Sequence, residues 1–581
     1  MPTTTSRGAD LLVRSLADAG VDTIFTLSGN HIMPIFDACK DAGIRLIHTR
    51  HEAAAVHMAD AWARLTGKVG VALVTGGPGH ANAVGALYTA AQAESPVVLL
   101  SGHAPLNQLG KGAFQEMAQA DLAAPLTKAS WTAQTTDGLA EDMARAFSTA
   151  LSGRPGPVHV SLPTDVLDAS VGSPRAVPEG AWRASPVVPD PDVLGDMLSR
   201  LRSARRPLIL TGPALLTRPG RAVSAALAAS TGVPVVGMES PRGVGDPCLG
   251  AFAEMLAQAD CVLLLGKRLD FTLKFGQAPA LAADVTVMQI DADDNELARS
   301  RAAFGDRLRA TCAGDAVSGA QGLMAAVAQA DAGSTVQAAA IDGASATGGG
   351  AGDGRAQGSG SQNLRADDKA ADWRQAVAAA IAYRPAAWAT ATAGVPDRVH
   401  PAAAFRPLQT LLDSHPDAVL VVDGGEIGQW AQACLSASHR VINGIAGSIG
   451  SALPFAVAAR VAVPGAPVVA VLGDGTFGFH AAEFDTAVRC GLPMVVVVGN
   501  DARWNAEYQI QVRDYGRDRT IGCELLPTRY DQVAAAFGGH GVNVTDPAMM
   551  DAAVQEAVGS GKPACINVMM EGLAAPTIRR G

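Results

Sequence analysis

Short apolar runs alternate with helix-like stretches along most of the 581-residue chain, in three successive blocks. Alternation of this kind is typical of a parallel sheet that is covered by helices on both faces. The expected fold class is therefore α/β, with three doubly wound parallel-sheet domains in series. We place these domains at residues 1–185, 192–330 and 372–581. The strands expected in the third domain are Ala418–Val422, Val468–Leu472, Met494–Val498 and Ala564–Val568.

The segment 331–371, between the second and third blocks, is rich in Gly, Ala and Ser. Such a composition buries too little apolar surface to offset the entropy that is lost on ordering the chain. The sequence therefore predicts a flexible linker here.

Composition narrows the class of protein. Hydrophobic residues make up 48% of the chain and charged residues 17%, so a large core can be buried and disorder of the whole chain is excluded. The net charge of −10 argues against a nucleic-acid or anionic-membrane partner, since both need clustered Lys and Arg. The eight cysteines contain no CxxC motif, and the N-terminus has no apolar signal segment. We therefore expect reduced thiols and a cytoplasmic location.

The strongest local signal is a buried strand that ends in Gly473-Asp474-Gly475. The glycines let the backbone approach a ligand closely, and the N-terminus of the following helix favours a phosphate. The next strand ends in Asn500-Asp501, and one crossover helix joins the two strands, so they lie side by side. Asp474 and Asp501 can then face one cation, typically Mg²⁺. The alternative for the Gly-Asp-Gly motif alone is a tight turn with no ligand.

These motifs resemble the coenzyme-binding signature of the thiamine-diphosphate superfamily that includes acetolactate synthase, benzoylformate decarboxylase and benzaldehyde lyase. In that signature, Gly-Asp-Gly is followed after 24 residues by an Asn-Asn pair, and here the pair is Asn500-Asp501. The resemblance implies that Mg²⁺ binds Asp474, Asp501 and the backbone carbonyl of Arg503. Aspartate at 501 keeps an oxygen ligand but adds negative charge beside the diphosphate of the coenzyme.

Further segments match the family in the same order along the chain. They are HTRHEAAA at 48–55, TGGPG at 75–79, FQE at 114–116, GRPGPVHVSLPTDV at 153–166, VVDGG at 421–425 and SIGSALP at 448–454. The resemblance implies that Glu52 shares a proton with N1′ of the aminopyrimidine and that Ile449 supports the thiazolium ring. A helix-terminal glutamate stabilised by the helix dipole is the alternative for Glu52. The implied coenzyme-binding set is Glu52, Gly425, Glu426, Ser448, Ile449, Gly473, Asp474, Gly475, Thr476, Asp501 and Arg503.

Three residues are candidates for contact with the substrate. In the benzaldehyde-lyase-like members, a His and a Gln occupy the positions of His31 and Gln115, and Asn30 lies in the same loop as His31. A neutral imidazole can donate a hydrogen bond to a substrate oxygen or relay a proton. The alternative is that Asn30 caps a helix and His31 is exposed beside it.

The second block raises a separate cofactor question. Its segments Gly266-Lys267-Arg268 and Ile290–Asp293 resemble those that hold FAD in acetolactate synthases, or ADP-like groups in relatives that use acyl-CoA. Some family members keep this domain without a nucleotide. FAD or an ADP-like nucleotide therefore remains an open alternative here.

The resemblance implies an enzyme that forms or cleaves C–C bonds of small-molecule 2-ketoacids or 2-hydroxyacyl compounds, similar to acetolactate synthase. The alternatives are 2-hydroxyacyl-CoA lyase, 2-ketoacid decarboxylase and benzaldehyde-lyase-like activity. A non-catalytic homologue would have lost carboxylates at 52, 474 or 501, and all three are present. A flavin oxidoreductase would need an acidic residue about 20 positions after its glycine motif, and only Asp501 comes near.

The family also places its coenzyme between the first domain of one subunit and the third domain of another. We therefore expect a homo-oligomer, either a dimer or a dimer of dimers, in which Glu52 and Asp474 act across a subunit interface.

Overall fold

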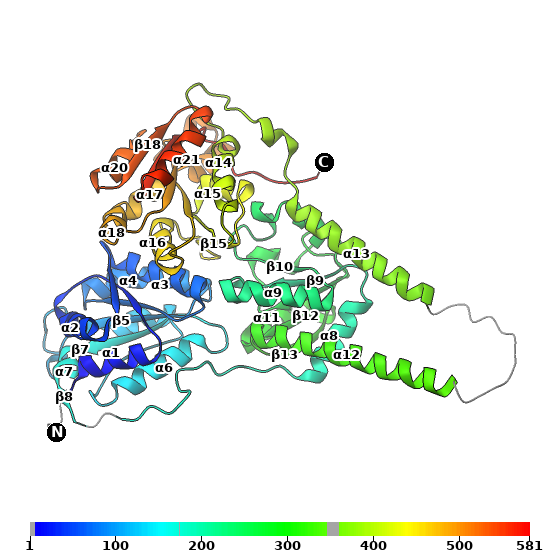
Figure 1. The fold of residues 1–581 in the computed structure, drawn as a ribbon, viewed down its shortest axis with the longest axis horizontal. Coiled ribbons are helices and arrows are strands. Elements are labelled where there is room, and N and C mark those ends of the chain that lie inside the picture. The colour runs from blue at the N-terminus through cyan, green and yellow to red at the C-terminus, as the bar shows by residue number, and fades with distance from the viewer. Residues whose placement is uncertain (1–5, 173–174, 346–359, 581) are drawn as a thin grey trace.

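The computed structural model describes residues 6–172, 175–345 and 360–580. It contains three parallel α/β sheets with helices on both faces, which confirms the expected fold class. Figure 1 shows the first and third domains stacked on each other, with the middle domain beside them.

The first domain has a six-stranded parallel sheet in the order β3-β2-β4-β5-β7-β6. A short antiparallel pair, β1 (Ser6–Arg7) with β8 (Ser170–Val171), ties together the two ends of the domain. The sheet strands are β2 (Thr23–Thr26), β3 (Arg45–His48), β4 (Gly70–Val74), β5 (Val97–His103), β6 (Ala129–Thr132) and β7 (Val158–Pro163). The α-helices are α1 (Gly8–Asp18), α2 (Met33–Ala42), α3 (Glu52–Thr66), α4 (Pro78–Gln92), α5 (Gln119–Ala123), α6 (Leu139–Leu151) and α7 (Thr164–Asp168).

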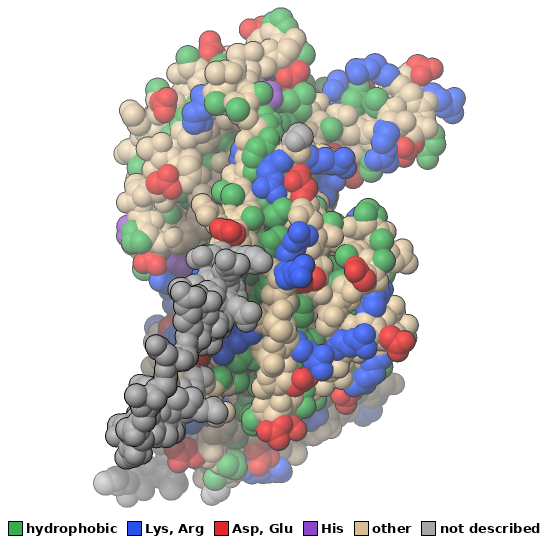
Figure 2. All heavy atoms as spheres, turned by 90° about the vertical axis from the view of Figure 1, so that its right-hand side faces the viewer, with side chains coloured by type: hydrophobic (Ala, Val, Ile, Leu, Met, Phe, Trp, Pro, Cys, Tyr) green, Lys and Arg blue, Asp and Glu red, His purple; other side chains and the backbone are tan. Residues whose placement is uncertain are grey.

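The middle domain has a five-stranded parallel sheet in the order β10-β9-β11-β12-β13. Its strands are β9 (Pro207–Thr211), β10 (Val235–Gly237), β11 (Cys261–Leu265), β12 (Thr286–Asp291) and β13 (Leu308–Ala313). Its helices are α8 (Pro191–Ser203), α9 (Arg218–Thr231), α10 (Phe252–Leu256), α11 (Asp294–Phe304), α12 (Ala316–Ser345) and α13 (Gly360–Ala382). Figure 2 shows the side of the molecule that carries this domain, where acidic and basic side chains are interspersed.

The third domain has a six-stranded parallel sheet in the order β15-β14-β16-β17-β19-β18. Its strands are β14 (Val419–Val422), β15 (His439–Ile442), β16 (Val468–Gly473), β17 (Val495–Asn500), β18 (His540–Val544) and β19 (Ala564–Met569). Its helices are α14 (Pro401–Asp413), α15 (Gly425–Cys434), α16 (Ala452–Ala462), α17 (Asp474–His480), α18 (Glu483–Arg489), α19 (Asn505–Tyr515), α20 (Tyr530–Ala536) and α21 (Met550–Gly559). The β-branched runs of β16 and β17 are fully buried, as in the centre of a parallel sheet.

The region expected to be a flexible linker differs from that prediction. Residues 331–345 continue α12 and residues 360–371 begin α13, while 346–359 lie outside the described residues. Alanine has the highest helix propensity, and it is frequent on both sides of the glycine run, so each flank extends a helix. Figure 1 shows the two helices projecting from the body of the molecule.

The expected start of the third domain at 372 also differs from the structure. The second half of α13 packs on the middle sheet, where Trp373 and Val377 join its core. The Trp373 indole N–H donates to the Pro207 carbonyl at 2.9 Å. The middle domain therefore receives a helix from beyond the glycine-rich segment.

The first and third domains share one hydrophobic core. Helices α3 and α16 consist mainly of small apolar residues, and they pack closely against each other. Arg64 of α3 is buried, pairs with Asp60, and donates to the Ile442 carbonyl of β15 at 2.6 Å. This contact holds the helix that begins at Glu52 against the third domain.

Two further properties concern the whole described chain. All eight cysteines are free. Within 6–172, 175–345 and 360–580, no helix combines the length and the apolar character that a membrane crossing requires.

Candidate active site

A pocket of about 210 Å³ lies at the carboxyl ends of the third domain's strands. This edge is where open α/β sheets bind their ligands. Most of the coenzyme-binding residues expected in this domain line the pocket. The lining consists of Gly424, Gly425, Glu426, Ile427, Gly447, Ile449, Gly473, Asp474, Gly475, Thr476, Asp501, Arg503, Trp504, Asn505, Ala506 and Glu507.

Asp474 lies at the start of α17, directly after β16, and its side chain is buried. One carboxylate oxygen accepts the Gly475 N–H at 2.9 Å, and the other accepts the Arg503 N–H at 3.2 Å. Burial raises the pKa of Asp474 to about 6 despite these hydrogen bonds.

Asp501 faces Asp474 from the neighbouring strand. Burial, reinforced by the charge of Asp474, raises the pKa of Asp501 to about 8. Both of its carboxylate oxygens are buried, and neither has a hydrogen-bond partner among the described residues. A buried carboxylate without a partner is costly, and a cation bound between the two acids would remove that cost.

The donor set fits Mg²⁺ held together with a diphosphate. In the described part of the chain, no cluster of three or more His, Cys, Asp or Glu side chains forms a complete metal cage. Mg²⁺ commonly binds through one or two carboxylates, with phosphate oxygens and water completing its octahedron. Two carboxylates beside an open pocket are what such a site requires.

The turn from Asn500 to Arg503 brings a backbone segment to the two acids. The Asn500 amide donates to the Thr528 carbonyl at 2.8 Å, and its oxygen accepts the Ala502 N–H at 3.2 Å. Ala502 has a φ of 56°, a left-handed conformation that non-glycine residues rarely adopt. Strain of this kind persists only where surrounding contacts enforce it, and it is common at functional sites.

Aromatic packing shapes the pocket wall. A Cβ atom placed on Gly475 would lie 2.7 Å from the ring of Trp504, so the indole packs directly on the Gly-Asp-Gly backbone. Trp504 also makes an edge contact with Phe479, at 6.3 Å between ring centroids. Thr476 turns its hydroxyl back to the Gly473 carbonyl at 3.1 Å.

Asp423 is a residue that the sequence analysis did not select. It is fully buried, and its carboxylate accepts N–H groups from Gly424, Gly450 and Ala452. It thereby fixes the loop that carries Ile449, whose side chain is half-buried in the pocket wall. An acid directly after a buried strand, in the VVDGG segment, was the available signal.

Glu426 lies at the pocket rim, in the first turn of α15. Its carboxylate pairs with Arg242 of the middle domain at 3.2 Å and accepts the Ala575 N–H of the C-terminal tail at 3.1 Å. Gly425, before it, has a φ of 78°, so this turn favours glycine. Ser448 is half-buried but does not line the pocket.

In the first domain, Glu52 begins α3 and is 9% exposed. Asn82 of α4 donates to its carboxylate at 3.1 Å. A Cβ atom on Gly79 would lie 3.3 Å from the other carboxylate oxygen, so the glycine leaves room beside the acid. Asn82 was missed by sequence reasoning because it lies three residues beyond the TGGPG segment.

His31, Thr75 and Gln115 lie on the same edge of the first sheet as Glu52. His31 is buried, and its Nδ1 is 3.1 Å from the Thr75 hydroxyl. Its ring stacks on Phe114, and burial lowers the pKa of the imidazole. Gln115 has a φ of 57° and packs against Gly77. Asn30 is exposed, and the alternative in which it caps a helix beside an exposed His31 does not hold.

Within one chain, the two groups of predicted residues are separate. Glu52, His31, Asn30 and Gln115 belong to the first domain, and none of them lines the pocket of the third.

Three family models match successive parts of the chain. They are the thiamine pyrophosphate enzyme N-terminal TPP binding domain at 6–122, the central domain at 194–310 and the C-terminal TPP binding domain at 423–568. The chain belongs to the thiamine pyrophosphate enzyme family. It is therefore a thiamine-diphosphate-dependent enzyme, with the pocket in its C-terminal and Glu52 in its N-terminal TPP-binding domain.

The relatives extend over nearly the whole chain. Acetolactate synthase large subunit IlvG of Mycobacterium tuberculosis is 33% identical over 98% of this chain and 97% of its own length. The 2-hydroxyacyl-CoA lyase 2 of Bos taurus is 30% identical over 93% of this chain and 85% of its own. The human protein of that name is 29% identical, with 97% and 90% covered.

Proposed function

We propose that this enzyme uses thiamine diphosphate and Mg²⁺ to form or cleave a C–C bond next to a carbonyl, as an acetolactate-synthase-like carboligase acting on 2-ketoacids. The observation that carries the Mg²⁺ assignment is the unpartnered Asp501 carboxylate beside Asp474. The similarity to an acetolactate synthase over the whole chain supports the choice of reaction.

When bound, thiamine diphosphate supplies a thiazolium ring that acts as an electron sink while the C–C bond is made or broken. Asp474, Asp501 and the Arg503 main chain would hold the metal and, through it, the diphosphate. Ile449, half-buried in the pocket wall, would support the coenzyme from its apolar side. Glu52 would hold the proton at N1′ of the aminopyrimidine, and its near-complete burial keeps that proton away from water.

Because Glu52 does not line the pocket of its own chain, we propose a homodimer or a dimer of dimers. Glu52 of one protomer would then complete the pocket of its partner. His31 and Gln115, on the same edge as Glu52, would face the substrate there. A neutral His31 can donate one hydrogen bond to a substrate oxygen, and its lowered pKa favours that form.

A 2-hydroxyacyl-CoA lyase is the second candidate, favoured by the relatives of that name. The two reactions differ in their substrates and can be separated directly. Purified enzyme would be loaded with coenzyme and Mg²⁺, then given either pyruvate or a 2-hydroxyacyl-CoA. Acetolactate from pyruvate supports the first proposal, and release of an aldehyde from the thioester supports the second.

Coenzyme binding itself is tested by thermal denaturation. A ligand that binds only the native state stabilises it by about 2.7 kcal/mol at a hundredfold excess over its Kd. We expect the midpoint to rise with thiamine diphosphate plus Mg²⁺, and to rise much less when EDTA replaces the metal. An unchanged midpoint at millimolar coenzyme and metal would falsify the Mg²⁺-diphosphate assignment.

A further inference from the structure

The carboxyl edge of the middle sheet is where a nucleotide would bind. All five strands are parallel, and in the order β10-β9-β11-β12-β13 the chain adds β10 on one side of β9 and β11 to β13 on the other, so the strand order reverses between β9 and β11. Open α/β sheets bind dinucleotides in the crevice at such a switch point. The structure therefore allows a direct test of whether FAD or an ADP-like group fits.

The switch point is filled by the protein's own backbone. A Cβ atom on Gly212, after β9, would lie 2.3 Å from the Gly266 carbonyl oxygen, after β11. A Cβ atom on Gly266 would in turn lie 2.7 Å from the Cβ of Ala316. The cavity nearby, lined by Pro213, Leu216 and Glu239, has a volume of about 10 Å³. Ligand pockets commonly measure about 300–1,000 Å³.

The Lys267 side chain occupies the same edge. It is fully buried, and its ammonium group donates to the Arg268 carbonyl at 2.9 Å and pairs with Asp270 at 3.2 Å. A lysine buried in this way takes the volume that a bound group would need, and its charge is already neutralised by the protein.

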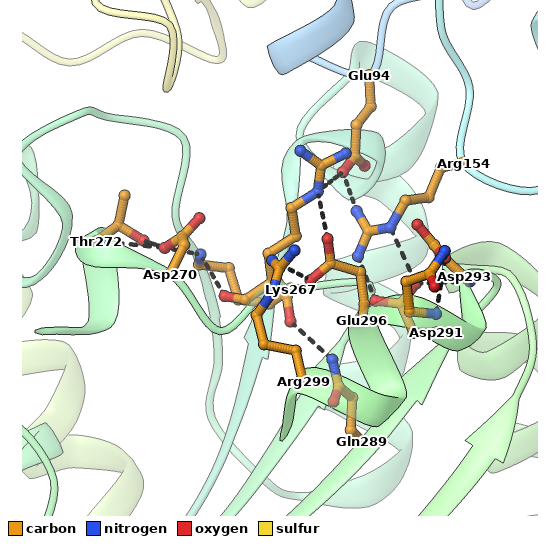
Figure 3. Close-up of polar contacts among 12 residues, drawn as sticks. Glu94, Arg154, Lys267, Asp270, Thr272, Gln289, Asp291, Asp293, Glu296 and Arg299 are labelled. Carbon is orange, nitrogen blue, oxygen red and sulfur yellow. Dashed lines mark hydrogen bonds and ion pairs between the residues drawn. The ribbon is translucent and has the colours of Figure 1, made fainter. Parts of the chain in front are cut away.

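Arg154 of the first domain contacts the carboxyl end of β12 (Figure 3). Its guanidinium forms a bidentate ion pair with Asp291, which is fully buried. It also pairs with Glu94 of its own domain. Glu296 of α11 joins this network through Arg268 at 3.6 Å.

An arginine from the third domain occupies the end of β10 in the same manner. Arg440 donates to Glu239 at 2.6 and 3.0 Å, and Asp246 lies 3.9 Å away. Glu239 is buried, and the charge of Arg440 offsets the cost of that burial, so the pKa of Glu239 is lowered. The middle sheet thus receives one largely buried arginine from each neighbouring domain, with side-chain exposures of 12% and 10%.

Both arginines connect to elements that carry the active site. Glu94, the partner of Arg154, follows α4, the helix whose Asn82 binds Glu52. Arg440 lies in β15, the strand that leads into the loop of Ile449. The ion pairs therefore fix the two catalytic domains against one common support.

We propose that the carboxyl edge of the middle sheet is a docking socket for the two catalytic domains and not a nucleotide site, with Arg154 and Arg440 as positioning residues. The consequence for catalysis rests on the function proposed above, whereas the absence of nucleotide binding does not. Two buried polar atoms at this edge, Thr211 Oγ1 and Gln289 Oε1, have no partner among the described residues. They are the groups that a nucleotide would use if the proposal were wrong.

The first test measures nucleotide binding to the full-length protein. FAD and ADP are each titrated in a calorimeter and in a thermal denaturation assay, with thiamine diphosphate plus Mg²⁺ as the positive control. We expect no saturable heat and no change of midpoint with either nucleotide. Saturable binding of FAD or ADP overturns the proposal.

The second test removes one arginine at a time. Removing one partner of a buried ion pair is strongly destabilising, so Arg154→Met and Arg440→Met should each lower the midpoint by about 5–10 °C. Amide hydrogen exchange should rise at least tenfold in α4 for Arg154→Met and in the 443–451 loop for Arg440→Met. Arg200→Met is the matched control, since Arg200 is exposed and pairs with the exposed Asp196 of its own helix.

The same variants report on positioning. At saturating coenzyme and below the melting range, kcat should fall about tenfold, with Arg154→Lys restoring part of it. If Arg154→Met does not fold, Asp291→Asn keeps the shape of the socket and removes one charge. Unchanged exchange and unchanged kcat in both folded variants would overturn the proposal. If the wild type has no carboligase activity but the variants still show altered amide hydrogen exchange, the docking role of the two arginines is supported and only the proposed reaction is refuted.

Discussion

The first and third domains have the same sheet topology but differ in what their strand ends offer. Counted along each domain, both sheets run second-first-third-fourth-sixth-fifth. The third strand is followed by Thr75-Gly76-Gly77 in the first domain, whereas in the third domain it ends at Gly473 and is followed by Asp474-Gly475. The same sheet topology therefore carries neutral residues after its third strand in the first domain and an aspartate there in the third domain.

The burial of the polar groups follows the same division. The third domain buries two facing carboxylates; burial raises the pKa of each, and the charge of Asp474 adds to the shift of Asp501. At the corresponding edge, the first domain buries Glu52 together with His31, and burial lowers the pKa of His31. Equal topology therefore supports a cation-holding edge in one domain and a proton-handling edge in the other, and the experiments below test that division.

Asp474→Asn should have the largest effect because it removes one of two metal carboxylates. We expect kcat/KM to fall about 10³-fold or more, since a catalytic metal contributes several kcal/mol. The rise of midpoint with coenzyme and Mg²⁺ should disappear as well. Asp551→Asn, an exposed acid of the same domain, is the control. A variant that keeps its coenzyme-dependent stabilisation would place the metal elsewhere.

Glu52→Gln should separate activity from binding. Loss of a positioned acid–base group costs about 10²–10⁴-fold in kcat. The coenzyme should still raise the midpoint as in the wild type, because the residues that hold the metal are intact. Glu141→Gln, an exposed acid of the first domain, should behave as wild type. If Glu52→Gln and Asp474→Asn lost coenzyme binding to the same extent, the assignment of cation binding to the third domain and proton handling to the first would be contradicted.

Mixing Glu52→Gln with Asp474→Asn tests whether the site is formed between Glu52 of one subunit and Asp474 of another. If Glu52 completes a partner's pocket, each mixed dimer contains one intact site and one doubly altered site. Random exchange of subunits should then restore about a quarter of wild-type activity. The mixture is unfolded partly, refolded and assayed beside each variant alone. Recovery no higher than the separate variants would argue for sites formed within one chain.

Glu483 should give the smallest effect, at the boundary of the two domains. Its buried carboxylate accepts the Arg50 N–H at 3.0 Å, and burial raises its pKa to about 7. Because the folded pKa is raised above the usual 4.5, the stability it contributes is present at low pH and is lost between about pH 4.5 and 7.

This loss amounts to roughly 3 kcal/mol for the wild type, and Glu483→Gln should lack it. The difference in melting midpoint between variant and wild type is measured at pH 5 and at pH 8. Taking this difference removes the pH-dependent contribution of the other carboxyl groups, which is the same in both proteins. A difference that does not change with pH would show that Glu483 is already ionised at pH 5.

The central strands could be predicted from sequence because they are continuous β-branched runs such as Val495–Val498. The two edge strands of the third domain were not: β15 and β18 contain half-buried polar residues, for example His439-Arg440 in β15. A strand near the sheet edge lacks the apolar run that marks a central one. Their absence from the prediction hid the shared topology of the outer domains.

The site was predictable where its residues follow a strand in a short motif, as with Asp474 and Asp501. Pairings that depend on tertiary structure were not predictable. Arg154 and Asp291 are 137 positions apart and belong to different domains, and no local pattern joins them. The same holds for Asp423, whose role depends on N–H groups of Gly450 and Ala452.

The indole of Trp504, packed on Gly475 beside the acid pair, gives this pocket a built-in optical reporter. Its fluorescence emission should change when a charged ligand or metal enters, with no label attached. The other six tryptophans contribute a constant background that a Trp504→Phe difference spectrum subtracts. Occupancy can therefore be followed in a stopped-flow instrument before any substrate is known.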